Sequence, residues 1–209
     1  THSQTLLPMV EGLLSTCGVS PGQLDFFAVT RGPGSFTGLR IAMAAVKGMA
    51  MAAGKPCVGV STLEALARNL AGFTGSAAAV MDARCGQVYA GLFTLEDGEA
   101  RRLAEDTALS VVELGKLLPA LKKPVFLVGD GAELCYNKLL EEPPPGPPPG
   151  EWLRLAPPHL RYQRASAAGA AALAAWLRGE EMDAGELVPA YLRLPQAERE
   201  LKKKQEEKP

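Results

Sequence analysis

A glycine-rich run between a short apolar segment and a long one carries the best-placed candidates for chemistry. Its members are Arg31, Gly32, Pro33, Gly34, Ser35, Thr37, Gly38 and Arg40. A loop of this kind that leads into a helix can hold an anion, because free backbone amides point at it and small residues allow close approach. The lysine of a Walker-type phosphate loop is missing, since Leu39 follows the last glycine. The residues alone therefore favour a structural strand-to-helix turn over anion binding.

A second group of polar residues follows an expected strand. Asp82, Arg84 and Cys85 bring an acid, a base and a thiol to the strand's end, where active-site residues often gather. Cys85 has no histidine nearby in sequence to activate its thiol, and Asp82 with Arg84 is typical of a turn. Asp130 stands between two glycines and could meet a nucleotide ribose, although a glycine-bordered turn explains it equally well. These residues therefore predict no catalytic side chain.

Histidines and cysteines give no sign of a metal centre. His2 and His159 are the only histidines, and neither lies in an HExxH motif or beside a cysteine at a ligand spacing. The four cysteines are scattered without a CxxC pair, which favours a reduced, cytoplasmic protein. The longest apolar stretch, residues 41–53, is interrupted by Lys47 and is too short to span a bilayer. We expect no metal ligands, no secretion signal and no membrane insertion.

The charge balance bears on nucleic-acid binding. Lys and Arg total 22 against 23 Asp and Glu, so the chain has no overall positive field that would hold a phosphate backbone. If a nucleic acid is the substrate, we expect another protein to hold it.

Strands and helices alternate along the chain, which predicts an α/β fold. Helices are expected over residues 2–18, 36–53, 61–70, 110–121, 131–140 and 165–178, and strands over residues 25–30, 58–60, 77–81 and 125–128, with a hairpin at 87–98. The 47% hydrophobic residues of the 209 suffice for a real core. The run PPPGPPPG at residues 143–150 is predicted to be a stiff surface spacer, because proline fixes φ and supplies no amide to a sheet.

The first two expected helices are more apolar than one buried face requires. Between residues 39 and 53 only Arg40 and Lys47 are charged, so this helix is apolar nearly all round. The first helix shows the same excess of leucine, valine and methionine. We interpret the pair as a docking surface for another helical element. The alternative is that strands absent from this chain cover both helices.

Several segments, taken together, resemble the bacterial threonylcarbamoyladenosine biosynthesis family called TsaB. In chain order they are HS with LLP at residues 2–8, RGPGSFTGLR at 31–40, KG at 47–48, GVSTLEALA at 59–67, DARCGQVYAGLF at 82–93, VGDGA at 128–132 and PAYLRLPQAE at 189–198. They run from one end of the chain to the other in the family's order. RGPGSFTGLR is a specific signature, and its combination with the last segment makes coincidence improbable.

The resemblance implies an α/β fold of the actin, sugar kinase and Hsp70 type, with two lobes. It implies a non-catalytic scaffold that lacks the metal-binding histidines of a catalytic relative and forms a heterodimer with it. That relative, the threonylcarbamoyltransferase subunit, modifies N6 of adenosine 37 in tRNAs that read codons beginning with A, and a small ATPase joins them. ATP is then used by the complex, tRNA is reached through the complex only, and this chain binds no cofactor tightly.

The family's docking arrangement agrees with the excess of apolar residues. In that family the first two helices of the N-terminal lobe pack against the matching helices of the partner as a four-helix bundle. The docking residues expected on this basis are Leu6, Leu7, Val10, Leu14, Leu39, Met43, Val46, Lys47 and Met49.

The resemblance also sets the expected domains and shows two departures. Residues 1–70 are expected to form the N-terminal lobe, residues 71–195 the C-terminal lobe, and residues 196–209 a charged, disordered tail. Family members open with a strand that carries an Asp-Thr-Ser type turn, followed by a hairpin, and neither precedes Thr1. The chain is then either truncated or a natural short form with an incomplete sheet. The second departure is Cys85, which stands where an Arg or Lys is common.

Two other functions remain open. Relatives on this fold bind ATP, and the catalytic relative was long described as a protease, so an ATP-dependent phosphotransferase or a peptidase is the chief alternative. The missing phosphate-binding opening strand argues against a phosphotransferase. The lack of a basic partner for any Ser or Cys argues against a peptidase. A regulatory homodimer that uses the same helices differs from the scaffold only in its partner.

Overall fold

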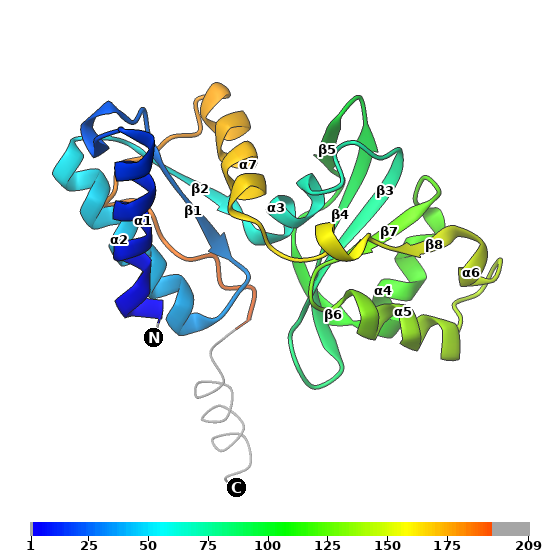
Figure 1. Ribbon diagram of the computed structural model, residues 1–209. Coiled ribbons are helices and arrows are strands. Elements are labelled where there is room, and N and C mark those ends of the chain that lie inside the picture. The colour runs from blue at the N-terminus through cyan, green and yellow to red at the C-terminus, as the bar shows by residue number, and fades with distance from the viewer. Residues whose placement is uncertain (1, 194–209) are drawn as a thin grey trace, which may run out of the picture.

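The computed structural model describes residues 2–193, and in it the chain forms two lobes, each built on its own sheet (Figure 1). The first half contains α1 (His2–Cys17), η1 (Pro21–Gln23), β1 (Phe27–Gly32), α2 (Phe36–Ala53), β2 (Cys57–Ser61) and α3 (Thr62–Arg68). The strands and helices that follow are β3 (Gly75–Asp82), β4 (Gln87–Glu96), β5 (Glu99–Arg102), β6 (Thr107–Ser110), α4 (Val111–Leu117) and η2 (Leu118–Ala120). The last are β7 (Val125–Val128), α5 (Ala132–Glu141), α6 (Pro149–Trp152), β8 (Leu153–Leu155), η3 (Pro158–Leu160) and α7 (Ala165–Leu177).

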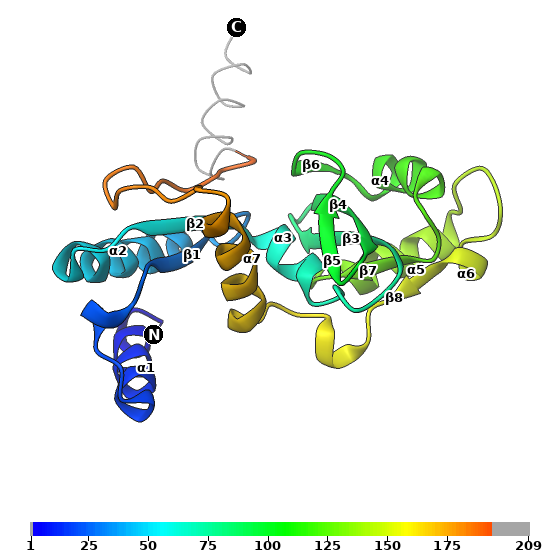
Figure 2. The same cartoon turned by 90° about the horizontal axis from the view of Figure 1, so that it is seen from above.

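The first lobe is a parallel pair of strands between helices. β1 and β2 pair with Phe27 opposite Cys57, and α2 and α7 lie on opposite sides of them (Figure 1). Because alternate residues of a strand point to opposite faces, Phe27 and Val29 pack with α2 while Val58 and Val60 pack with α7. α1 packs along α2 and projects from the lobe (Figure 2).

The second lobe contains a six-stranded mixed sheet. Its strand order is β5-β4-β3-β7-β8, with β6 also paired to β4. β3, β7 and β8 are parallel, whereas β4 runs antiparallel to β3. α4 and α5 cover one face, where Ala78 and Val80 point, and α3 covers the other, where Ala77 and Ala79 point. The alternation of strands and helices therefore produces the expected α/β architecture.

The chain returns to the first lobe after completing the second sheet. α7 packs on the first sheet, Met182 forms an antiparallel bridge with Cys57, and Leu187 belongs to the core beneath α2. The expected C-terminal lobe of residues 71–195 therefore differs from the packing, since residues from 165 onward belong to the first lobe. Local sequence patterns could not show this return, because all of these contacts join segments far apart in the chain. The expected tail at residues 196–209 lies outside the described residues.

Two apolar segments have packing that their composition alone does not reveal. α2 is long and apolar enough to cross a membrane by composition, and its buried residues Leu39, Met43, Val46 and Ala50 lie on one side of the helix. The proline run is exposed over most of its length, as expected of a surface spacer. Its last proline, Pro149, is buried and begins α6, which places the buried Trp152 for a hydrogen bond from Nε1–H to the Pro147 oxygen at 3.0 Å.

Candidate functional site: an interlobe cleft and a helical surface

The glycine-rich run forms the predicted turn from β1 into α2. β1 ends at Gly32, and Ser35 caps α2 by accepting a hydrogen bond from the Gly38 amide at 3.3 Å. A side chain at Gly32 would stand 2.6 Å from the carbonyl oxygen of Ala190, and its φ of +129° suits glycine. Arg31 extends from the end of β1 past Gly59 of β2, and Arg40 stacks over the ring of Phe36.

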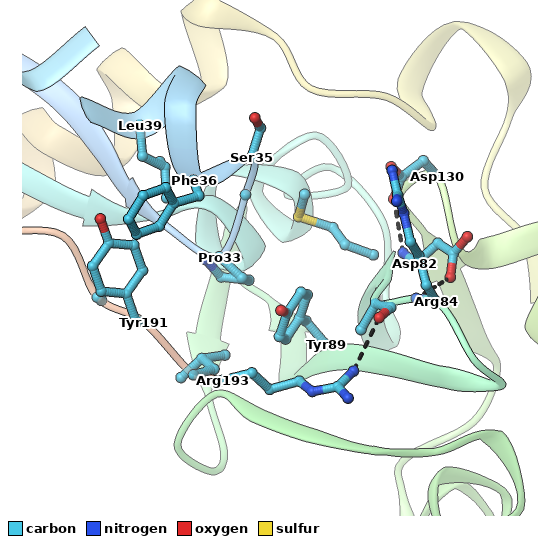
Figure 3. Close-up of a pocket in the computed structure, with 15 residues that line it drawn as sticks. Pro33, Ser35, Phe36, Leu39, Asp82, Arg84, Tyr89, Asp130, Tyr191 and Arg193 are labelled. Carbon is cyan, nitrogen blue, oxygen red and sulfur yellow. Dashed lines mark hydrogen bonds between the residues drawn. The ribbon is translucent and has the colours of Figure 1, made fainter. Parts of the chain in front are cut away.

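A cleft of about 490 Å³ lies between the lobes and is bordered by this loop (Figure 3). Its lining residues are Pro33, Gly34, Ser35, Phe36, Leu39, Met81, Asp82, Ala83, Arg84, Tyr89, Asp130, Ala190, Tyr191, Leu192 and Arg193. Of the glycine-rich run, Pro33, Gly34 and Ser35 therefore reach the cleft, whereas Arg31 lines a separate cavity. The last four residues of that list were missed from the sequence, because nothing local places the end of the chain here.

The acidic residues of the cleft hold the turn between β3 and β4. The Asp130 carboxylate accepts the Asp82 amide at 3.2 Å, and the Asp82 carboxylate accepts the Arg84 amide at 2.7 Å. Arg84 and Cys85 both have positive φ, 63° and 55°, so the turn needs such support. The prediction of a structural turn is thus confirmed by its hydrogen bonds.

The cleft offers little to a nucleophilic mechanism. Its lining contains no histidine, and the Ser35 hydroxyl accepts from the helix amide that it caps. Between residues 2 and 193, no group of three His, Cys, Asp or Glu side chains is placed to hold a metal ion. The cleft brings the aromatic rings of Phe36, Tyr89 and Tyr191 together with the cationic side chains of Arg84 and Arg193.

The expected docking residues divide into three groups. Leu39, Met43 and Val46 are 7%, 4% and 9% exposed, so the prediction that they face a partner is wrong. They form one stripe of α2, at spacings of four and three residues, that packs against the chain's own first lobe. Leu6, Val10, Leu14, Lys47 and Met49 are half-buried, and Leu7 is exposed. The Lys47 ammonium donates to the Gly185 oxygen at 3.3 Å, which turns it toward its own lobe.

Apart from Leu7, the exposed side chains of α1 and α2 differ from those predicted. On α1, Met9 and Leu13 are exposed together with Leu7. On α2, the exposed residues at four- and three-residue spacings are Phe36, Arg40, Ala44, Gly48 and Met51. The small residues Ala44 and Gly48 lie at the centre of this exposed stripe, whereas Leu39, Met43 and Val46 fill the buried one.

Comparison with known proteins identifies the family. The model of the family "TsaD: tRNA N6-adenosine threonylcarbamoyltransferase" matches residues 1–137. The chain belongs to this family. Curated relatives named "tRNA threonylcarbamoyladenosine biosynthesis protein TsaB" include one from Bacillus subtilis, 33% identical over 141 residues, and one from Escherichia coli, 43% identical over 90 residues. The predicted resemblance to TsaB is thereby confirmed.

The chain matches only part of these relatives. The two alignments cover 68% and 42% of this chain, and 61% and 39% of the Bacillus subtilis and Escherichia coli proteins. A threonylcarbamoyltransferase of Erythrobacter litoralis is 40% identical over 72 residues, which are 34% of this chain and 21% of that protein. Relatives named TsaB and relatives named threonylcarbamoyltransferase thus both share sequence with this chain.

Solved structures confirm the fold. The structure of YeaZ from Pseudomonas aeruginosa aligns with a TM-score of 0.74 at 34% identity, over 91% of this chain and 84% of that one. Another Pseudomonas aeruginosa structure, described as an uncharacterized protein with similarity to peptidase YEAZ, aligns with a TM-score of 0.73 at 32% identity, over 92% and 85%. The expected α/β fold of the actin, sugar kinase and Hsp70 type is therefore confirmed.

Proposed function

We propose that this chain serves in the formation of threonylcarbamoyladenosine in tRNA as a non-catalytic scaffold. It binds the catalytic threonylcarbamoyltransferase subunit through the outward faces of α1 and α2, in the cytoplasm. The observation that carries the proposal is the apolar, small-residue surface that these two helices expose. The names of the relatives indicate the pathway, and the exposed surface of α1 and α2 indicates that the chain acts by binding a partner.

The exposed side chains of α1 are unusually apolar for a surface in water. Leu7, Met9 and Leu13 are 49%, 71% and 63% exposed, and Met51 at the far end of α2 is 73% exposed. Met9 and Leu13 are four residues apart and lie together on one side of α1, while Leu7 lies on another side of the helix. Isolated exposed apolar residues are ordinary, but neighbouring ones are typical of an interaction site. Burial of such a side chain stabilises a complex by about 1.5–3 kcal/mol before the costs of association.

The outward face of α2 suits close packing by another helix. Ala44 and Gly48 lie at its centre, and a side chain built on Gly48 would meet no atom within 4 Å. The distance between packed helices falls with the size of the side chains at the contact. A partner helix can therefore approach α2 closely at Gly48, with Met51 and Phe36 toward the two ends of the contact.

The remaining members of the proposed complex do not need a site on this chain. With 22 basic and 23 acidic residues, the chain has no field to hold tRNA, so tRNA is bound through the complex. ATP is used by the complex, which includes a small ATPase, and this chain holds no cofactor tightly. The absence of histidine from the cleft lining supports a non-catalytic role over a peptidase.

The test combines two disruptive substitutions with two matched controls. Gly48→Phe places a bulky group in open space on the outward face, and Leu13→Glu places a charge there. Gly48→Ala adds only a methyl group at the same position, and Val112→Glu adds a charge at a residue that is 50% exposed on α4 in the other lobe. Each variant is mixed with the catalytic subunit of the same organism and measured by size exclusion with light scattering and by a tRNA modification assay.

We expect Gly48→Phe and Leu13→Glu to remain folded and to lose the heterodimer and the modification, whereas Gly48→Ala and Val112→Glu retain both. A heterodimer that survives both disruptive variants would remove this surface from the proposal. Light scattering of the chain alone tests the alternative that the same surface pairs two copies. Modification activity without this chain, or catalysis by this chain alone, would overturn the scaffold role.

A further inference from the structure

The last four described residues, 190–193, run between the two lobes, and we call them the strap. Ala190 and Leu192 line both the cleft and a second cavity of about 260 Å³ on the side of Arg31 and Ser61. The strap therefore divides the space between the lobes into two parts. Figure 3 shows Tyr191 beside Phe36 and the Arg193 side chain extending across the cleft.

The strap is fixed to the first lobe by its backbone and by an aromatic stack. The Ala190 amide donates to the Arg31 oxygen at 2.9 Å, next to Gly32, where only a glycine leaves room for the Ala190 carbonyl. The Tyr191 ring stacks on Phe36 with centroids 5.2 Å apart. The Arg40 guanidinium lies 4.0 Å from the centroid of Phe36 and donates from Nε to the Tyr191 hydroxyl at 3.1 Å. Several contacts of different kinds thus hold this end.

The strap reaches the second lobe through one charged donor. Arg193 donates from Nη1 to the carbonyl oxygen of Ala83 at 3.0 Å, in the turn between β3 and β4. That acceptor is itself well fixed, since the Ala83 amide donates to the Gln87 oxygen at 3.0 Å and Asp82 is held by Asp130. A hydrogen bond from an ionised donor to a fixed acceptor is among the stronger kinds in proteins.

We propose that the strap is an interlobe latch that fixes the rotation of one lobe against the other. The chain itself crosses between the lobes twice, from β2 into α3 at Ser61–Thr62 and at residues 160–165. The Ser61 hydroxyl also donates to the Asp106 carboxylate of the second lobe, and α3 and α7, which follow the two crossings, pack against each other. Crossings that lie together leave a hinge about which the lobes can turn. The Arg193–Ala83 contact joins the lobes at the cleft, away from that hinge, and so limits the turning.

The test measures the distance between the lobes in solution. Cys17 on α1 is exposed, while Cys57 and Cys135 are fully buried, so a spin label attaches selectively to Cys17. The second label is placed by Lys116→Cys on the exposed side of α4, with Cys85→Ser removing the other exposed thiol. Electron–electron double resonance on the full chain then gives the distribution of distances between the lobes.

Two variants break the latch at its two ends. Arg193→Met keeps the length of the side chain and removes the donors, and Tyr191→Ala removes the stack on Phe36. We expect either change to broaden the distance distribution and to raise the population of rotated lobes about tenfold, which corresponds to about 1.4 kcal/mol. Arg193→Lys, which keeps a charged donor, should restore part of the narrow distribution.

Val188→Ala is the matched control, because Val188 lies just before the strap and is 56% exposed. It should leave the distribution unchanged. A distribution that stays narrow in Arg193→Met would overturn the proposal, and equal broadening by Val188→Ala would do the same. If Tyr191→Ala unfolds the first lobe, the comparison of Arg193→Met with Arg193→Lys is sufficient to test whether the strap limits the rotation of the lobes.

Discussion

Asn69 donates a hydrogen bond from its side-chain amide to the carbonyl oxygen of Leu160, 91 positions later in the chain, at 2.9 Å. The second hydrogen of the same amide reaches the Tyr162 oxygen, also at 2.9 Å. Asn69 ends α3, and the two acceptors lie at the end of η3 and in the segment that leads from the second lobe to α7. One side chain therefore ties the end of α3 to the segment on which the chain returns to the first lobe.

Asn69→Ala should lower the free energy of unfolding by about 1–3 kcal/mol, because one part-buried and one exposed carbonyl oxygen lose their donor. Asn69→Asp should cost at least as much, since a carboxylate can only accept and would face both carbonyls. Urea denaturation followed by circular dichroism measures both effects. Asn137→Ala, at an exposed position of α5, is the control and should stay within about 0.5 kcal/mol of the parent. An Asn69→Ala variant as stable as this control would show that the two segments do not depend on the amide.

Two glycines should respond in opposite directions to the same substitution. Gly129 follows β7 with a φ of +114°, and a side chain there would stand 2.0 Å from the Val80 oxygen. Gly129→Ala should therefore destabilise the protein by at least about 1–3 kcal/mol. Both the positive φ and the close approach of the Val80 oxygen are unfavourable for an alanine. Gly169 lies inside α7 with nothing within 4 Å of such a side chain. Gly169→Ala should raise stability by about 0.5–1 kcal/mol, because alanine favours the helix.

Thermal and urea denaturation of the two glycine variants show directly whether each substitution raises or lowers the stability. Equal destabilisation by both would mean that the local backbone conformation of Gly129 has no special role. Stabilisation by Gly129→Ala would contradict the close approach of Val80.

The sequence predicted local structure well where the deciding contacts are local. The hydroxyl cap of α3 is present, because Ser61 accepts the amides of Leu63 and Glu64, and the Asp97–Gly98 turn joins β4 to β5 as expected of a hairpin. The glycine-rich turn from β1 to α2 is equally local. Each of these features depends on side chains within a few residues of the backbone they fix.

The docking face was predicted less well, for a physical reason. In a helix that is apolar nearly all round, periodicity alone does not say which stripe faces inward. Met43 is large and fills the core beneath α2, whereas Gly48 is small and stays outside. The strap could not be predicted at all, because Tyr191 contacts Phe36 only after the chain has passed through the other lobe.

The buried thiol of Cys135 should make the protein less stable in alkali. Burial, with a smaller contribution from the charge of Asp82, raises the pKa of Cys135 to about 12, and burial also raises the pKa of Cys57. In the unfolded chain a cysteine ionises near its ordinary value of 9.0, so between about pH 9 and pH 12 the unfolded state holds fewer protons than the folded state. The free energy of unfolding must then fall as pH rises, by up to about 1.4 kcal/mol per pH unit for each such thiol. Below that window both states keep the proton, and the thiol contributes no pH dependence.

Urea denaturation at successive pH values above 8 measures this slope, and Cys135→Ala isolates the contribution of one thiol. Tyrosine and lysine side chains also titrate in this range, but they are the same in both proteins. The variant will be less stable at neutral pH because it leaves a cavity, so the slopes and not the absolute stabilities are compared. We expect the slope of the variant to be shallower by up to about 1.4 kcal/mol per pH unit. Parallel curves for the two proteins would show that Cys135 ionises as easily in the folded chain as in the unfolded one, and that its side chain is not shielded from water.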